Sequence, residues 1–220
     1  MAVESVADGR QRVRGAVARP ALSTGYGQDF IQRGWGAWGA APFADLMTAT
    51  DAACAHPRID ATRIAAMGGS FGGYMANWIA GHTDRFAAIV THASLWALDQ
   101  FGSTTDLAYY WCREMTPEMT ASHSPHRFVD RITTPMLVIH GDKDYRVPIG
   151  EALRLWYDLL AGSGLPAGAD GTSPTGFCTS HPNTTGCWRH STRKSGTRSL
   201  LRSSPNTCSE NPANCPNCSE

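Results

Sequence analysis

The stretch IAAMGGSFGGYMANWIAG, residues 64–81, holds the pattern Gly-x-Ser-x-Gly around Ser70. Its apolar start, residues 64–67, predicts a short buried strand, and residues 71–81 predict a helix. The serine therefore stands at a sharp turn between a strand and a helix, where the backbone is strained. Because a side chain would collide in so tight a turn, we expect glycine to be required at Gly68 and Gly72.

Such a turn can prepare a serine for nucleophilic chemistry. The strain lifts the hydroxyl of Ser70 clear of the sheet, where a histidine can reach it. The backbone amide of Phe71 lies at the start of the helix, where the helix dipole favours negative charge. We therefore expect this amide to form half of an oxyanion hole. The alternative is a glycine-rich turn in which the serine is incidental.

The sequence on either side of this turn predicts an α/β fold. Short apolar segments that predict strands alternate with segments that predict helices. Strands of this kind belong to a mostly parallel sheet that is covered by helices on both faces. Outside the turn, the predicted helices are residues 42–56 and 149–160, and the predicted strands are residues 86–91 and 136–140.

Two carboxylates follow the clearest of these strands. The segment HGDKDYRVP, residues 140–148, places Asp142 and Asp144 just after the strand at 136–140. Side chains at the carboxyl ends of parallel strands meet at one edge of the sheet, so either carboxylate could act together with Ser70. Spacing does not choose between them, and for each the alternative is a turn aspartate that bonds its own backbone.

Three segments together resemble the catalytic domain of the prolyl oligopeptidase family, in its acylaminoacyl-peptidase and dipeptidyl-aminopeptidase branch. They are STGYGQDF at residues 23–30, GGSFGGY at 68–74 and HGDKDYRVP at 140–148. The resemblance covers residues 23–174. It implies a partial α/β-hydrolase fold and a serine peptidase that cleaves short peptides through an acyl-enzyme.

The resemblance also implies roles for individual residues. Ser70 matches the family's nucleophile and Asp144 its acid, which leaves Asp142 as a turn residue. Arg146 resembles a family residue that contacts the substrate backbone, since a guanidinium suits a carbonyl or carboxylate, and a surface ion pair is the alternative. Tyr74 is expected to line the pocket for the residue before the scissile bond, or simply to pack against its helix.

The chain departs from the family pattern at both ends. Residues 1–22 show no clear periodicity and nothing like the loop of the family's second oxyanion donor, so we expect a fragment of the family architecture without the β-propeller. Residues 175–220 are rich in Ser, Thr, Pro and Cys, so we expect a disordered tail. The catalytic histidine is expected within residues 176–186. His181 lies there without the family's flanking pattern and with no predicted strand before it, so the base stays unassigned.

Our hypothesis for this tail is a change of reading frame near Pro174. Residues 175–186 can be encoded so that one added base gives HRFLYFPSEHHW, an apolar strand followed by a histidine loop of the family's kind. The same regrouping of residues 186–197 gives VLAPQHAKVWY, which suits a last helix. We therefore expect this chain to be inactive or strongly impaired as a peptidase.

Composition disfavours several kinds of partner. The 220 residues carry 19 basic and 19 acidic side chains, so net charge favours neither nucleic acid nor a membrane surface. Neither a secretory signal nor a transmembrane helix is predicted, and we expect a cytoplasmic protein. Cys215 and Cys218 enclose two residues, but a structural zinc site needs four ligands, so we expect no metal and no cofactor.

Two other functions stay open beside the peptidase. One is a carboxylesterase that uses the same turn, which the segment DYRVP at residues 144–148 disfavours. The other is a fragment without catalysis that binds partners through exposed sheet edges.

Overall fold

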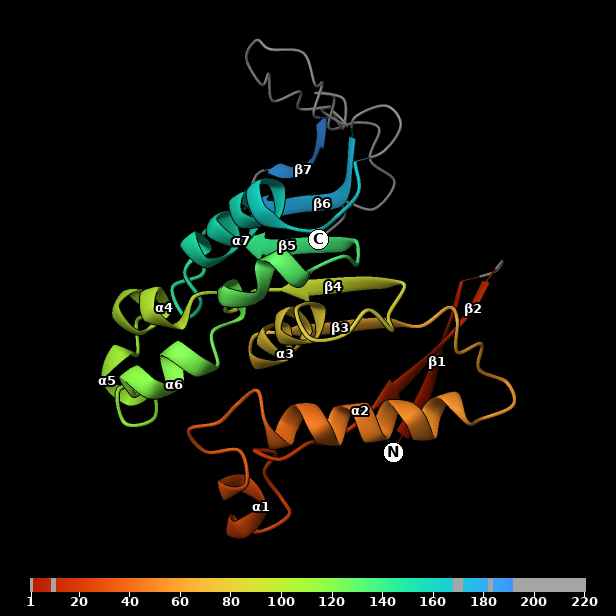
Figure 1. The fold of residues 1–220 in the computed structure, drawn as a ribbon, viewed down its shortest axis with the longest axis horizontal. Coiled ribbons are helices and arrows are strands. Elements are labelled where there is room, and N and C mark those ends of the chain that lie inside the picture. The colour runs from red at the N-terminus through yellow and green to blue at the C-terminus, as the bar shows by residue number, and fades with distance from the viewer. Residues whose placement is uncertain (1, 9–10, 168–171, 182–183, 192–220) are drawn as a thin grey trace, which may run out of the picture.

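A five-stranded sheet forms the centre of the molecule, with the strand order β3-β4-β5-β6-β7 (Figure 1). The computed structural model describes residues 2–8, 11–167, 172–181 and 184–191. Four strands are parallel and the last is antiparallel to its neighbour, which confirms the prediction of a mostly parallel sheet in an α/β fold. The strands are β3 (Ala65–Gly69), β4 (Ala88–His92), β5 (Met136–Gly141), β6 (Thr172–His181) and β7 (Thr184–Ser191).

The three long helices lie where the sequence predicts them. They are α2 (Ala41–Cys54), α3 (Phe71–Ala80) and α7 (Ile149–Gly162). Pro42 stands in the first turn of α2, where a helix needs no amide donor. In α7, the buried side chains of Ala152, Leu155 and Leu159 recur at spacings of three and four, which places them on one face of the helix.

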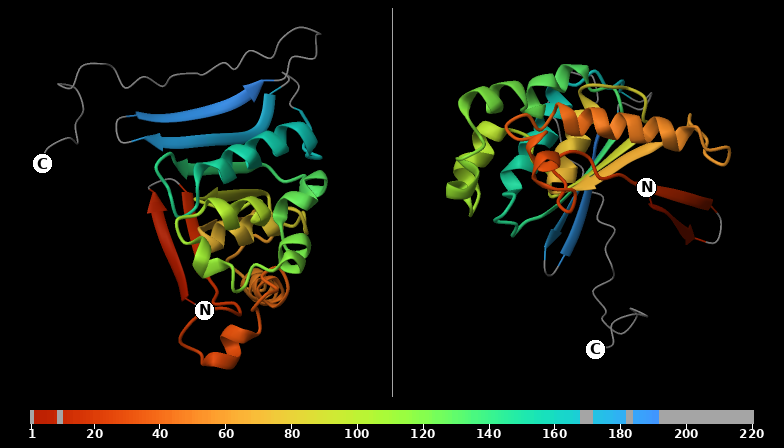
Figure 2. Two further views of the ribbon diagram at one scale, coloured as in Figure 1. Left: turned by 90° about the vertical axis from the view of Figure 1, so that its left-hand side faces the viewer. Right: turned by 90° about the horizontal axis from the view of Figure 1, so that it is seen from below.

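The main core joins these helices to one face of the sheet. Side chains from α3 and α7, with others from α2 at their margin, pack against inward-facing side chains of the strands, among them Ile89, Val138 and Phe177. On the opposite face, Met67 is 78% exposed and Leu137 is 37% exposed. The expectation of helices on both faces is therefore wrong for the described residues, because α2, α3 and α7 all share one core (Figure 2).

Short helices connect β4 to β5 and pack against α3. They are α4 (Leu98–Thr104), α5 (Ala108–Trp111), α6 (Pro117–Ser122) and the 3₁₀ segment η1 (Pro125–Arg131), while α1 (Gln28–Gln32) lies earlier in the chain. A second apolar cluster forms between these elements and α3, with Trp38, Tyr74 and Phe101 among its buried members.

Both ends of the described chain contain strands that the sequence does not predict. Strands β1 (Ala2–Asp8) and β2 (Gln11–Val17) pair antiparallel, although the sequence shows no clear periodicity there. Strand β6 pairs with β5, so part of the predicted disordered tail belongs to the sheet. That pairing gives hydrogen-bond partners to the backbone of β6, and Phe177 adds apolar burial in the main core. The rest of the tail, residues 192–220, lies outside the described residues, together with Cys215 and Cys218.

Within the described ranges, no helix has the length and apolar character needed to cross a bilayer.

Candidate active site

The turn at Ser70 joins β3 directly to α3. Ser70 has φ 56° and ψ −121°, a left-handed backbone conformation that a residue with a side chain seldom adopts. Its backbone N–H donates to the carbonyl of His92 at 3.0 Å, which fixes the turn to the end of β4. The serine is exposed. The strained, exposed position that the sequence predicts for Ser70 is thus observed.

The glycines around the serine are required for different reasons. A Cβ on Gly68 would lie 2.2 Å from the carbonyl oxygen of Gly72, so the strand and the helix could not approach as they do. A Cβ on Gly73 would lie 2.5 Å from the Cβ of Ser94 and 2.8 Å from the carbonyl oxygen of His92. A Cβ on Gly72 would meet nothing within 4 Å. The expectation for Gly68 holds, whereas the steric requirement expected at Gly72 falls on Gly73.

The parallel strands bring the other site residues to the edge where Ser70 lies. Asp144 follows β5, and His181 is the last residue of β6, so both stand at carboxyl ends in the same sheet as β3. The expectation that no strand precedes His181 is wrong, because β6 ends at this residue. The structure therefore places a hydroxyl and a carboxylate at one edge, where open α/β sheets bind their ligands.

The acid loop, residues 142–147, is built around the side chain of Asp144. Its Oδ1 accepts the backbone N–H groups of Arg146 at 3.0 Å and Val147 at 2.9 Å. Its Oδ2 lies 3.7 Å from Nε2 of His140, and the side chain is 25% exposed. One oxygen thus holds the loop in shape, and the other faces His140 at a distance too long for a hydrogen bond.

The side chain of His140 contacts the last residue of this loop. The side chain is fully buried, and its Nε2 lies 2.7 Å from the carbonyl oxygen of Val147, so Nε2 must carry the proton and donate. Burial lowers the pKa of His140, against smaller opposing effects of Val147 and Asp144. The imidazole is therefore neutral at neutral pH, and its 3.7 Å contact with Asp144 is not an ion pair.

Arg146 stands at the surface of the acid loop. Its side chain is 54% exposed, and its Nε donates to Oδ1 of Asp106 at 2.8 Å. This hydrogen bond raises the pKa of the guanidinium. The surface ion pair that we gave as the alternative for Arg146 is thus present, and it leaves the exposed remainder of the guanidinium facing solvent.

Tyr74 does not reach a substrate surface in this structure. Its side chain is fully buried, and its hydroxyl donates to the carbonyl oxygen of His123 at 2.8 Å. The ring packs within 6.2 Å, centroid to centroid, of Trp38, Phe71 and Trp78, and burial raises the pKa of the phenol. The expectation that Tyr74 lines a substrate pocket is therefore wrong here, because the ring fills the second apolar cluster.

Phe71 is the first residue of α3, so its backbone amide stands at the helix N-terminus as the sequence predicts. Its half-buried ring packs against Trp38. Within the described residues, no three His, Cys, Asp or Glu side chains come together in a way that could hold a metal ion.

Comparisons with known proteins agree with these features. Residues 15–167 match the sequence model described as the prolyl oligopeptidase family. The chain is 37% identical over 148 residues to "Uncharacterized peptidase YuxL" of Bacillus subtilis, covering 64% of this chain and 22% of that protein. It is 32% identical over 154 residues to "Dipeptidyl-peptidase 5" of Porphyromonas gingivalis, covering 65% of this chain and 22% of that protein.

Solved structures show the same similarity. The acylaminoacyl peptidase of Pyrococcus horikoshii superposes with a TM-score of 0.62 and 26% sequence identity, over 64% of this chain and 24% of that one. A puromycin-hydrolyzing peptidase of Mycobacterium tuberculosis gives a TM-score of 0.63 and 26% identity, over 73% of this chain and 24% of that one. This chain thus spans less than a quarter of the length of each of these four relatives.

Proposed function

The chain belongs to the prolyl oligopeptidase family, and from this membership we propose that it carries a serine-type peptidase site with Ser70 as its nucleophile. One observation supports this proposal above the others. Ser70 is exposed at a left-handed turn, and Asp144 follows a parallel strand of the same sheet, so both stand at one edge. Short peptides are the proposed substrates, and the cytoplasm is the proposed location.

The proposed reaction begins with attack of Ser70 Oγ on the carbonyl carbon of a peptide bond. A histidine takes the serine proton and later gives it to the leaving amine, while Asp144 orients the imidazole. The backbone amide of Phe71 would stabilise the oxyanion of the tetrahedral intermediate. Water then attacks the resulting ester in the same way and releases the acid product.

No histidine of this chain is assigned as the catalytic base. Without it, turnover falls on the order of a million-fold, because serine and histidine act as a unit. We propose that the site is strongly impaired for this reason, and that a change of reading frame near Pro174 removed the family's histidine loop. His181 stands at the same edge but lacks the flanking residues of that loop.

A carboxylesterase would use the same turn and the same edge. The peptidase is favoured because the named relatives are peptidases and because Arg146, with much of its guanidinium exposed beside Asp144, suits a peptide carbonyl or carboxylate. A fragment without catalysis is the remaining alternative, and the exposed Met67 on the open face of the sheet is the observation that favours it.

A fluorophosphonate probe tests the proposal, since it labels a serine only where the hydroxyl is activated. We expect slow labelling that maps to Ser70 by mass spectrometry and disappears in Ser70→Ala. Ser122→Ala, which removes another exposed serine, should label like the parent chain. Equal labelling of Ser70→Ala would contradict Ser70 as the nucleophile, whereas no labelling at all of a chain shown to be folded would favour the fragment without catalysis.

A further inference from the structure

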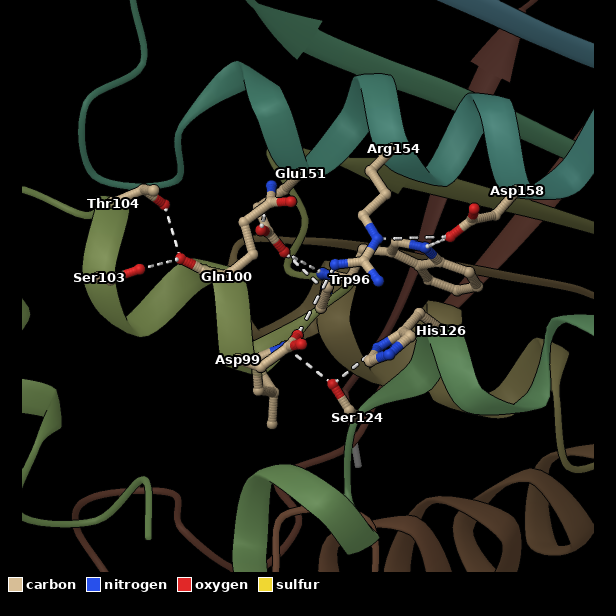
Figure 3. A network of polar contacts seen from close by, with 12 residues as sticks. Trp96, Asp99, Gln100, Ser103, Thr104, Ser124, His126, Glu151, Arg154 and Asp158 are labelled. Atoms are coloured by element: carbon tan, nitrogen blue, oxygen red, sulfur yellow. Dashed lines mark hydrogen bonds and ion pairs between the residues drawn. The ribbon is translucent and has the colours of Figure 1, made fainter. Parts of the chain in front are cut away.

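A buried carboxylate holds the segment that follows β4. Glu151 in the first turn of α7 is fully buried, and its Oε2 accepts the backbone N–H groups of Trp96 at 2.7 Å and Ala97 at 2.8 Å (Figure 3). Its Oε1 accepts from Nε2 of Gln100 at 3.0 Å. One side chain of α7 thus fixes the entry to α4 through three donors.

The exit from α4 is fixed to the acid loop. Thr105 Oγ1 donates to the carbonyl oxygen of Arg146 at 2.7 Å, and the backbone N–H of Asp106 donates to the carbonyl oxygen of Tyr145 at 3.0 Å. The carboxylate of Asp106 accepts from Nε of Arg146 at 2.8 Å. Three hydrogen bonds therefore join the two residues after α4 to two residues of the acid loop.

The bridging segment, residues 96–106, connects these two attachments as a stiff element. Its helix α4 buries Leu98 and Phe101, each 1% exposed, and the backbone N–H of Leu98 donates to Oγ of Ser124 at 2.8 Å. A displacement at its start is therefore carried to its end. The acid loop itself leads straight into α7, whose Glu151 N–H donates to the carbonyl of Pro148 at 2.9 Å. The contacts thus form a closed ring: acid loop, α7, Glu151, bridging segment and acid loop again.

Other charged groups surround Glu151, but their hydrogen bonds and ion pairs are made with other partners. Arg154 on α7 lies 3.7 Å from Asp99 on α4 and 3.8 Å from Asp158 on its own helix. Asp158 accepts the indole N–H of Trp96 at 2.7 Å, and Nδ1 of His126 on η1 lies 3.0 Å from Oγ of Ser124. In Figure 3, Arg154, Asp158 and His126 lie to the right of Glu151.

We propose that Glu151 is a positioning residue that sets the acid loop, and with it Asp144 and Arg146, through the bridging segment. This inference deepens the proposed peptidase site and rests on it only in giving the acid loop a catalytic purpose. An apolar residue at this position would avoid the cost of burying a carboxylate, but it would leave two backbone amides without an acceptor.

The pH dependence of stability separates the carboxylate of Glu151 from its neighbours. Burial raises the pKa of Glu151 to about 7, although the amides of Trp96 and Ala97 and the charge of Arg154 act in the opposite direction. Because the folded-state pKa lies above the ordinary value of 4.5 for a glutamate, the contribution of Glu151 to stability is fully present below pH 4.5 and is lost as pH rises through about 7.

We therefore expect the urea midpoint of the wild-type chain to fall relative to that of Glu151→Gln between about pH 5 and about pH 8. The quantity to measure is the difference in urea midpoint between the two proteins at each pH. Burial also lowers the pKa values of His126 and His140, but both histidines are present in both proteins, so their effect cancels in the difference. A constant difference across this range would contradict the assigned titration.

Amide hydrogen exchange tests the ring directly. Glu151→Ala removes the acceptor of Trp96 and Ala97, so exchange at the amides of Arg146 and Val147 should rise at least about tenfold more than at Ile89, a sheet amide bonded to the carbonyl of Pro135. Glu151→Gln keeps an acceptor oxygen and should restore exchange to within about threefold of wild type. Asp51→Ala, which removes a carboxylate of α2 that is paired with Arg85, should leave the acid loop unchanged.

Asp106→Ala opens the ring at the exposed contact between Asp106 and Arg146. It is the variant to test if Glu151→Ala fails to fold. By reciprocity of coupling, it should raise exchange at the amides of Trp96 and Ala97, which Asp106 does not touch. Equal changes at the acid loop and at Ile89, or no response at Trp96 and Ala97, would overturn the proposal. Exchange needs no catalysis, so a chain that shows these responses but labels equally after Ser70→Ala would refute the proposed nucleophile and leave the ring standing.

Discussion

Grafting HRFLYFPSEHHWVLAPQHAKVWY in place of residues 175–197 is expected to raise fluorophosphonate labelling at Ser70 by at least about a thousandfold. The structure gives the physical reason for placing the graft here. Residues 176–180 of β6 pair in parallel with residues 137–141 of β5, so RFLYF would occupy an existing strand position. The two adjacent histidines of the graft would then follow that strand at the edge where Ser70 and Asp144 lie.

The size of the expected effect follows from how triad residues act. Removal of the histidine alone costs about as much as removal of the whole triad, on the order of a million-fold in turnover. Restoration of a base should therefore raise the rate of reaction at Ser70 by a large factor, even where a second oxyanion donor is lacking. One such donor changes the rate by only about a hundred- to a thousandfold. Labelling rates, measured by gel fluorescence against time, report this gain without any choice of peptide substrate.

Two variants define the comparison. Changing both adjacent histidines of the graft to alanine should return the rate to that of the chain as given. His181→Ala in the chain as given should leave its slow labelling unchanged if this histidine is not the base. A folded graft that labels no faster than the parent chain would contradict the reading-frame hypothesis and the role of the missing loop.

The sequence predicts β3, β4 and β5 of the central sheet because their signals are local. The apolar runs at 86–91 and 136–140, and the glycine turn after residue 67, each identify an element without knowledge of its neighbours. The helix stripe of Ala152, Leu155 and Leu159 is likewise visible in the spacing alone. These elements carry Ser70 and the acid loop, and so the edge of the sheet that holds them could be predicted.

Features that depend on distant contacts could not be predicted in the same way. Tyr74 has the same local sequence whether it lines a pocket or fills a core, and the surrounding Trp38 and Trp78 decide the matter. Residues 172–181 carry no apolar run, and their strand follows from pairing with β5. The role of Asp106 depends on contact with Arg146, which lies 40 residues further along the chain.

Glu151 is a different case, because its position in the sequence is itself a signal of a buried carboxylate. It stands four residues before Leu155 on the apolar stripe of α7, and a carboxylate at such a position must find donors or lose its charge. The identity of those donors, the amides of Trp96 and Ala97, could come only from the structure.

Gly68→Ala is expected to destabilise the chain by about 3 kcal/mol, near the upper end for overpacked sites. The new Cβ would stand 2.2 Å from the carbonyl oxygen and 2.4 Å from the carbonyl carbon of Gly72, and both are backbone atoms at the start of α3. Because no side chain can rotate away, β3 and α3 must separate. The urea midpoint at one fixed pH, with the slope of unfolding held as a check on two-state behaviour, measures the loss.

Gly72→Ala supplies the matched control within the same turn. Its Cβ would meet nothing within 4 Å, and alanine is favoured over glycine inside a helix by about 0.5–1 kcal/mol, so the midpoint should stay or rise slightly. The two substitutions add the same methyl group four residues apart, and only contact with the backbone of the opposite element separates them. Equal losses from both variants would show that the close approach of β3 and α3 is not what sets the shape of the turn at Ser70.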